Sequence, residues 1–310
     1  MKKVLFIFLL AVVAHKSYSQ QIPVISQYMF NTLTLNPAIA GIKDEKIVTR
    51  LQNRNQWVGI ENAPVTQLGS IHGFIEKWNV GLGAVVFNDV AGPLRQTGVQ
   101  TSYAYHIRTS PESKMSLGLQ LGLFQQRINT SLLTTDMPND EAVNKAGESH
   151  ILPDASFGAL YYSYKYYLGF SIPHLIGGNV SNTNFKLSRH YYILGGYLFD
   201  VSDEIQVEPS VLLRAVAPTP LSADINAKVI YKEVFWVGGS YRTSKEMVMM
   251  AGFRVAEKFY FGYSYDITFN PLREYTKGSH ELMIGFDIDK PGRDNKKGIK
   301  RTLDAAPAFL

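Results

Sequence analysis

Seven histidines and scattered carboxylates are the side chains of this 310-residue, cysteine-free chain that could carry acid, base or metal chemistry. Zinc hydrolases space two histidines around a glutamate as H-E-x-x-H, and serine hydrolases set the nucleophile in G-x-S-x-G; neither pattern occurs. The glycines of GLGA at 81–84 fall within a strand-like segment rather than before a helix, so they indicate no phosphate loop. The sequence therefore predicts no catalytic residue, no cofactor and no metal site, and a hydrolase is only a minor alternative.

Binding chemistry is better represented, in two stretches that mix amides with aromatic rings. The first, SQYMFNTLTLNPAIAG at 26–41, suits neither a helix nor a strand, and Pro37 restricts Asn36 to extended geometry. The second, RNQW at 54–57, lies where a strand-like segment ends in an external loop. Rings pack on apolar walls and amides satisfy irregular backbone. The candidate binding residues are Tyr28, Phe30, Asn31, Leu35, Asn36 and Pro37 in the first stretch, and Arg54, Asn55, Gln56 and Trp57 in the second.

Alternating segments would hold these stretches in place. In SLGLQLGLF at 116–124, leucine recurs at every second position, which predicts a β-strand with one apolar face. Similar segments recur to the end of the chain, and several reach the 9–11 residues or so that a tilted membrane strand needs. About fourteen strands are predicted, at 46–54, 65–74, 79–88, 95–107, 114–126, 155–163, 166–173, 190–199, 205–215, 222–231, 234–242, 247–255, 259–267 and 279–288.

Short and long connections alternate between these strands. If the mature N-terminus is taken as periplasmic, the short connections face the periplasm and the long ones face outward. Outer-membrane barrels have short periplasmic turns and longer external loops, whereas a Greek-key sandwich gives no reason for such alternation. The fold class predicted is all-β, a transmembrane up-and-down antiparallel β-barrel of about fourteen strands. A soluble exported sandwich or a propeller is the alternative. Residues 89–94 and 127–154 are expected to be external loops, and the second is long enough to fold over the lumen.

The N-terminal residues read as a signal peptide, with a basic start, an apolar run from Val4 to Ala14 and small residues at Ser17 and Ser19. Without Lys2, Lys3 and Lys16, the 31 Lys and Arg fall to 28 against 26 Asp and Glu, so no nucleic-acid partner is predicted. The predicted division is residues 1–19 as signal peptide, 20–45 as a pre-barrel segment or plug, 46–289 as barrel and 290–310 as a basic periplasmic tail.

Four ordered motifs resemble the PorP/SprF family of Bacteroidetes outer-membrane proteins, associated with the type IX secretion system and gliding motility. They are QYMFN…LNPA.AG, RNQWVG…AP.TQ, GLG…ND..GP.R.TG and YAYHI, and they run from Ser26 to Ile107. The remaining chain matches in strand rhythm and in SLGLQLG rather than in firm motifs.

This resemblance implies a fourteen-stranded barrel in the outer membrane of a Gram-negative, Bacteroidetes-type bacterium. It also implies non-enzymatic work with a secreted surface adhesin that carries a C-terminal sorting domain, with periplasmic components of the secretion system, and with outer-membrane lipid. The alternative is a channel for small or hydrophobic solutes. The pre-barrel segment is expected to enter the lumen, and Arg54 to Trp57 are expected to form either a docking surface or an ordinary loop with an aromatic belt residue.

Overall fold

The computed structural model describes residues 24–43, 46–133, 149–177 and 187–289. The signal peptide predicted at 1–19, the tail predicted at 290–310 and the central part of the 127–154 loop lie outside these residues. Within the described residues, no helix has both the length and the apolar composition to cross a membrane.

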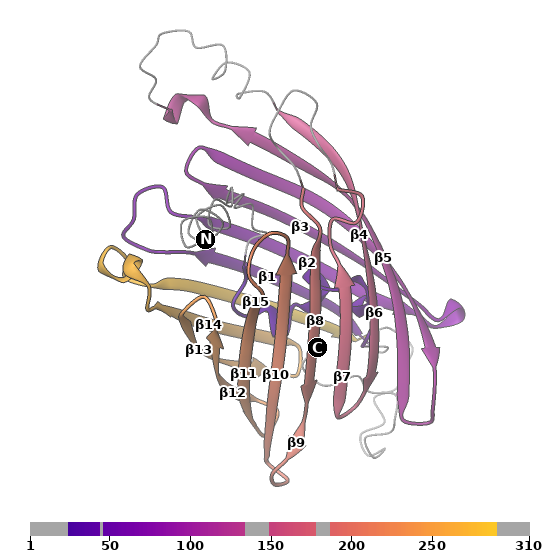
Figure 1. Ribbon diagram of the computed structural model, residues 1–310. Coiled ribbons are helices and arrows are strands. Elements are labelled where there is room, and N and C mark those ends of the chain that lie inside the picture. Colours follow the sequence, from indigo (N-terminus) through magenta and orange to yellow (C-terminus); the bar gives the residue numbers. More distant parts are fainter. Residues whose placement is uncertain (1–23, 44–45, 134–148, 178–186, 290–310) are drawn as a thin grey trace, which may run out of the picture.

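The strands form one closed antiparallel sheet (Figure 1). Strands β1 and β15 pair with each other, and the additional pairing of β10 with β11 closes the ring. In the described part of the chain, β8 and β9 both pair with β10 and occupy one position in the wall. The fifteen strands therefore form a fourteen-stranded barrel, which confirms the predicted fold class. The bounds are β1 (Lys46–Asn55), β2 (Val65–Ile75), β3 (Val80–Ala91), β4 (Leu94–Arg108), β5 (Ser113–Ile128), β6 (His150–Ser163), β7 (Tyr166–Ile172), β8 (His190–Tyr197), β9 (Phe199–Asp200), β10 (Ile205–Val216), β11 (Ser222–Tyr231), β12 (Phe235–Arg242), β13 (Glu246–Val255), β14 (Phe259–Thr268) and β15 (Ser279–Asp289).

Strand alternation separates an apolar outside from a polar inside. The four leucines of β5 point outward and are 37% to 56% exposed, whereas Ser116 and Gln120, on the other face of the strand, are buried in the lumen. In β11, Ile225 and Val229 face outward while Asp224 and Lys228 face inward. A charged residue on the lipid face costs about 2–4 kcal/mol at mid-membrane, so this distribution is the one that a barrel in lipid requires.

The two ends of the barrel differ. The connections 76–79, 109–112, 164–165, 201–204, 232–234 and 256–258 lie at one end, together with the start of β1 and the end of β15. The longer connections, between β1 and β2, β5 and β6, β7 and β8, and β14 and β15, begin and end at the other. We call them the inner and outer ends, because short turns are periplasmic in such barrels. Exposed rings surround the inner end, as an interfacial girdle would, at Tyr105, Tyr161, Tyr166, Tyr197, Tyr231, Phe235 and Phe259.

Two outer connections are shorter than predicted. The predicted extent of the loop at 89–94 is wrong, because β3 and β4 continue to a tight turn at Gly92 and Pro93. Gly92 takes a φ of +58° in this turn. Strand β6 begins at His150 instead of 155, although Pro153 lies within it. Pairing of β6 with β7 starts only at Phe157, so Pro153 lies on an unpaired edge, where its missing N–H is tolerated.

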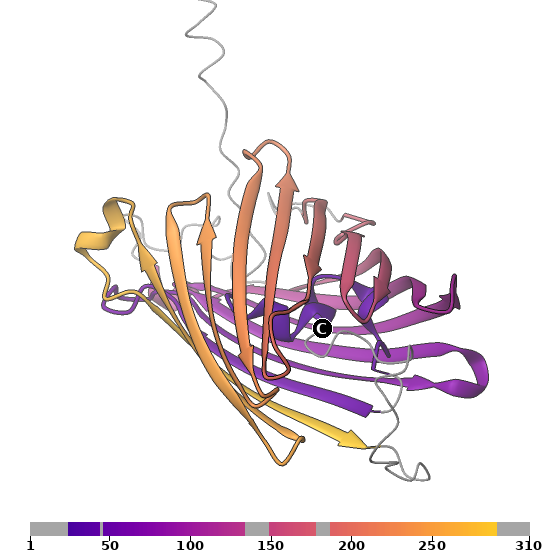
Figure 2. The same cartoon turned by 90° about the horizontal axis from the view of Figure 1, so that it is seen from below.

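The pre-barrel segment enters the lumen, as predicted. We call residues 24–43 the plug. It forms three 3₁₀ turns, η1 (Tyr28–Phe30), η2 (Thr32–Thr34) and η3 (Pro37–Ile39), and Figure 2 shows them enclosed by the strands of the wall. Every plug residue is buried or half-buried. Three further 3₁₀ turns, η4 (Glu76–Trp78), η5 (Thr130–Leu132) and η6 (Pro271–Glu274), lie in connections.

Candidate functional site: the plug and the outer vestibule

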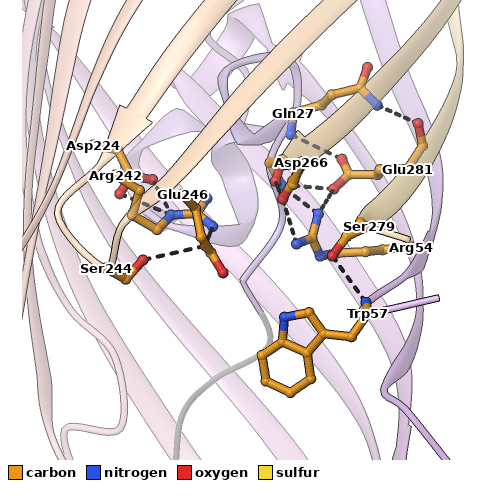
Figure 3. A network of polar contacts seen from close by, with 12 residues as sticks. Gln27, Arg54, Trp57, Asp224, Arg242, Ser244, Glu246, Asp266, Ser279 and Glu281 are labelled. Atoms are coloured by element: carbon orange, nitrogen blue, oxygen red, sulfur yellow. Dashed lines mark hydrogen bonds and ion pairs between the residues drawn. The ribbon is translucent and has the colours of Figure 1, made fainter. Parts of the chain in front are cut away.

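The beginning of the plug is held by three buried charged residues that we call the latch: Arg54, Asp266 and Glu281 (Figure 3). Arg54 Nη2 lies 2.6 Å from Asp266 Oδ2, and Arg54 Nη1 lies 3.3 Å from Glu281 Oε2. Ser26 donates its backbone N–H to Glu281 Oε2 at 2.7 Å and its hydroxyl to Asp266 Oδ2 at 2.6 Å. Gln27 N–H donates to Glu281 Oε1 at 3.0 Å. The plug therefore adds three hydrogen-bond donors to the two carboxylates, beside those of the guanidinium.

An aromatic contact fixes η1 against the opposite wall. The Phe30 and Trp236 ring centroids are 4.2 Å apart. Lys228 Nζ lies 4.8 Å from the Phe30 centroid and 2.8 Å from Glu208 Oε2. A desolvated cation over a ring adds attraction beyond area burial. The ring thus packs on the wall while the lysine beneath it keeps a carboxylate partner.

Amides join the centre of the plug to β1 and β2. Asn31 donates from Nδ2 to Gln52 Oε1 at 2.8 Å and accepts from Ser70 Oγ at 2.7 Å. Arg50 donates from Nε to the Phe30 carbonyl at 3.1 Å and forms an ion pair with Asp287 at 2.6 Å. These contacts satisfy backbone and side-chain groups that the lumen would otherwise leave without water or a partner.

The Asn36–Pro37 step caps η3 and binds the far wall. Asn36 Oδ1 accepts from Ala38 N–H at 2.9 Å, and Pro37 occupies the first position of the turn, where its missing N–H costs nothing. Asn36 Nδ2 donates to the carbonyls of Ala159 at 3.0 Å and Phe170 at 3.3 Å. The restricted geometry predicted for Asn36 is observed, with φ −145° and ψ 114°.

Glycines in the wall make room for this part of the plug. A Cβ on Gly81 would lie 1.8 Å from the Ala40 carbonyl oxygen, and one on Gly118 would lie 2.3 Å from Ala38 N. Side-chain carbons do not approach other atoms so closely, so these strand positions require glycine. Gly81 of GLGA and Gly118 of SLGLQLG thus serve contact with the plug.

Gly81→Ala should displace the plug, because the added methyl group must push the Ala40 backbone aside. Overpacking of this kind costs about 1–3 kcal/mol. We expect a lower midpoint of thermal unfolding in detergent than in wild type. Gly239→Ala is the matched control, since a Cβ there meets only an ordinary contact of 3.7 Å. Equal midpoints for the two variants would contradict the close packing of plug and wall.

Two histidines bind the end of the plug. Gly41 donates its N–H to His72 Nδ1 at 3.2 Å, and His106 Nε2 lies 2.8 Å from the Ala40 carbonyl oxygen. His106 Nδ1 in turn lies 2.8 Å from the Tyr162 hydroxyl. The structure places both histidines in the lumen as hydrogen-bond partners of the plug.

Burial shifts the pKa of two ionisable plug residues. Burial, with Asp224 nearby, raises the pKa of the Tyr28 hydroxyl, which accepts a hydrogen bond from Asn226. Burial lowers the pKa of the Lys43 ammonium, and the carboxylate of Asp287, 3.3 Å away, opposes that shift. The environment therefore favours the neutral phenol of Tyr28, whereas at Lys43 the carboxylate of Asp287 offsets only part of what burial costs the ammonium.

The plug runs from the outer end of the barrel towards the inner end. Ser26 contacts Arg54, which lies near the outer end of β1, whereas Lys43 contacts Asp287 at the inner end of β15. With the mature N-terminus on the periplasmic side, the plug is expected to enter the lumen from the inner end. The structure instead places Val24, the first described residue, on the outer side of the latch, and sequence alone gave no sign of this direction.

This direction predicts that Val24 is reachable from outside the cell. The natural chain lacks cysteine, so a single Val24→Cys variant can be labelled without background. We expect a membrane-impermeant maleimide to modify it on intact cells, as it should modify Ser244→Cys in the outer turn of β12 and β13. Glu257→Cys, in an inner turn, should react only after the outer membrane is permeabilised. Labelling of Val24→Cys that matches Glu257→Cys would contradict the direction.

Above the plug lies a cavity of about 770 Å³, which we call the outer vestibule. Val24, Ile25, Tyr28 and Leu35 of the plug form its floor. Its walls come from the outer ends of β4, β5, β10 and β12 and from the residues that follow β1, β7 and β10. It is the recess in which the plug, the wall and the outer connections meet.

The vestibule brings together five of the ten candidate residues, listed here: Tyr28, Leu35, Pro37, Gln56 and Trp57. Phe30, Asn31 and Asn36 lie deeper, between plug and wall. Arg54 is a latch residue, 1% exposed, rather than part of a surface loop, and Asn55 points outward and is exposed. Sequence reasoning missed Asp266 and Glu281, because they lie more than 200 residues from Arg54 and look like ordinary inward strand positions.

Comparison with known proteins identifies a family. The model of the family described as "Type IX secretion system membrane protein PorP/SprF" matches residues 17–286. A search of curated proteins found no match.

Solved structures show a shared fold. The toluene transporter TbuX of Ralstonia pickettii aligns with a TM-score of 0.53 at 7% identity, over 84% of this chain and 93% of that chain. A TodX deltaS2S3 mutant monoaromatic hydrocarbon channel aligns with a TM-score of 0.48 at 7% identity, over 84% and 94% of the two chains. A mutant Rh. blastica porin reaches a TM-score of 0.35 at 11% identity, over 78% and 99%. At this identity, the likeness to TbuX shows an outer-membrane barrel fold and nothing of function.

Proposed function

Because this chain belongs to the PorP/SprF family of type IX secretion system membrane proteins, we propose that it is a non-enzymatic receptor barrel in the outer membrane. It binds the C-terminal sorting domain of a secreted surface adhesin, and so delivers or anchors that adhesin at the cell surface. Its outer connections and the vestibule contact the adhesin. Its inner turns contact periplasmic components of the secretion system.

The plug is the observation that carries this proposal. A solute pore needs a path through the lumen, but here an internal segment of the same chain fills it from the latch to Asp287. The remaining recess opens beside the long outer connections, where a protein ligand can reach it. A plugged barrel with an outer recess fits a receptor better than a conduit.

Purification from the native outer membrane in mild detergent tests this function. We expect one large secreted protein with a C-terminal sorting domain to co-purify in fixed proportion to the barrel. It should be lost when that passenger's sorting domain is deleted, while the barrel is recovered in unchanged amount. Recovery of the barrel alone, from cells that secrete their adhesins normally, would refute an anchoring role.

A channel for small hydrophobic solutes is the second candidate. The vestibule favours it, since cavities of 300–1,000 Å³ are typical of small-molecule sites and apolar plug residues form this floor. The fold is also shared with a protein described as a toluene transporter. Uptake of a monoaromatic hydrocarbon that depends on this protein, with no adhesin recovered, would favour the channel.

A further inference from the structure

We infer that the outer vestibule is a binding site for a short, extended, uncharged polypeptide segment of the passenger. This inference rests on the proposed receptor function and names the surface that performs it. Four features of the vestibule carry it: a wall of free amides, a strained tryptophan, charges that are already paired, and an apolar floor.

The amides lie on two adjacent strands. Gln96 and Gln100 of β4 and Gln126 of β5 point inward and line the vestibule, and Gln96 pairs in register with Gln126. Their side chains make no hydrogen bond to any other residue in the described part of the chain. A primary amide offers two donors and an acceptor, which matches the alternating N–H and C=O groups of an extended peptide.

Trp57 contributes a donor that has no acceptor among the described residues. Its indole Nε1 is buried without a hydrogen bond, although its ring lines the vestibule. Its φ of +50° is a left-handed conformation that is unfavourable for a bulky residue, held in part by its backbone N–H, which donates to Ser279 Oγ at 3.1 Å. Strain and an unsatisfied donor in one residue are typical of a functional position. Because Nε1 is closed off from solvent, a ligand carbonyl oxygen would complete this site after the ring turns its N–H towards the vestibule.

The charges opposite Trp57 are paired with one another (Figure 3). Arg242 Nη1 lies 2.6 Å from Glu246 Oε2, and its Nε lies 3.2 Å from Asp224. Arg214 Nη2 lies 2.6 Å from the same aspartate. Two guanidiniums and two carboxylates cancel, so this wall has no net charge with which to select an anion or a cation. The ligand that fits is therefore polar along its backbone and uncharged.

The floor and the size of the cavity define the rest of the ligand. Val24, Ile25 and Leu35 present apolar surface, and Phe87 and Phe124 line the vestibule beside Gly98, between the levels of Gln96 and Gln100. A cavity of about 770 Å³ is in the range of small-ligand sites, so it holds only a few residues of a chain. The predicted segment is short, with apolar side chains towards the plug and its backbone towards the glutamines.

Site-directed photocrosslinking in the native cells tests this inference. The probe is p-benzoyl-phenylalanine at position 100, in place of Gln100. The matched control carries it at Val99, one residue away on the lipid face and 48% exposed. We expect light-dependent adducts from position 100 that map to one short segment of a single secreted protein, and none from position 99. Adducts that contain only glycan or lipid, or no adduct at all, would overturn the peptide site.

Two further outcomes separate this inference from the receptor function. An adhesin that co-purifies without crosslinking at position 100 would leave the receptor function standing and refute the vestibule site. A mapped segment from a secreted protein without a sorting domain would support the peptide site and refute the adhesin.

Trp57→Phe gives a quantitative readout, since it keeps an aromatic ring and removes the five-membered ring that carries the indole N–H. Loss of one hydrogen bond to the ligand should lower the crosslinking yield at position 100 by about fivefold at equal barrel levels. Unchanged yield would show that the indole N–H does not bind the ligand.

Discussion

Deletion of residues 20–44 should open the barrel and make cells permeable to large hydrophilic antibiotics that the outer membrane normally excludes. The hydrogen-bonded strands of the fourteen-stranded wall close on themselves without help from the plug. A lumen of that size is not filled by the side chains of the wall. Antibiotic sensitivity, compared with cells making the intact protein at the same level, is the measurement.

Heat modifiability on a gel shows whether the shortened barrel has folded. A folded barrel that still excludes the antibiotics would contradict the role of the plug as a stopper. A barrel that fails to fold would show that the wall depends on the plug, which is a different role from the one assigned here.

Arg54→Ala should be the most destabilising single substitution in the lumen. It removes the cation between Asp266 and Glu281, which are 1% and 0% exposed, and leaves two buried carboxylates without a positive partner. Breaking a buried pair in this way costs about 3–5 kcal/mol. The free energy of unfolding from urea titration in lipid vesicles is the measurement, and Arg273→Ala, on the exposed turn η6, should change it little.

Removing all the latch charges together should be milder. In a triple variant with Arg54→Met, Asp266→Asn and Glu281→Gln, no unpaired charge remains and the amides can still bind Ser26 and Gln27. We therefore expect most of the lost stability to return. A triple variant as unstable as Arg54→Ala would show that the latch acts through shape rather than charge.

The wall of this barrel could be predicted from sequence because it depends on local alternation. The leucines of β5 point to lipid and its glycines to the lumen as their spacing indicates, since side-chain direction alternates in any strand. Alternation did not predict where a strand begins or ends, because that depends on the strand with which it pairs. Strand β6 extends past Pro153 because β7 is too short to pair there, and the sequence of β6 alone cannot reveal the length of its neighbour.

The site was less predictable because long-range contacts build it. The aromatic and amide residues of the plug could be chosen by type, but Ser26 binds Glu281, which is 255 positions away. Alternation with Arg50 and Gln52 indicates an inward Arg54, but nothing near it names the carboxylates that it binds. The direction of the plug and the vestibule above it follow from these distant partners, so they required the three-dimensional arrangement.

The central claim is that the plug closes the lumen, so that the barrel works as a receptor and does not conduct solutes. Planar-bilayer recording of the intact purified protein tests it most directly. We predict that insertion of folded barrels produces no steady ionic current at moderate voltage. A stable, reproducible open-channel current through the full-length protein would contradict the claim.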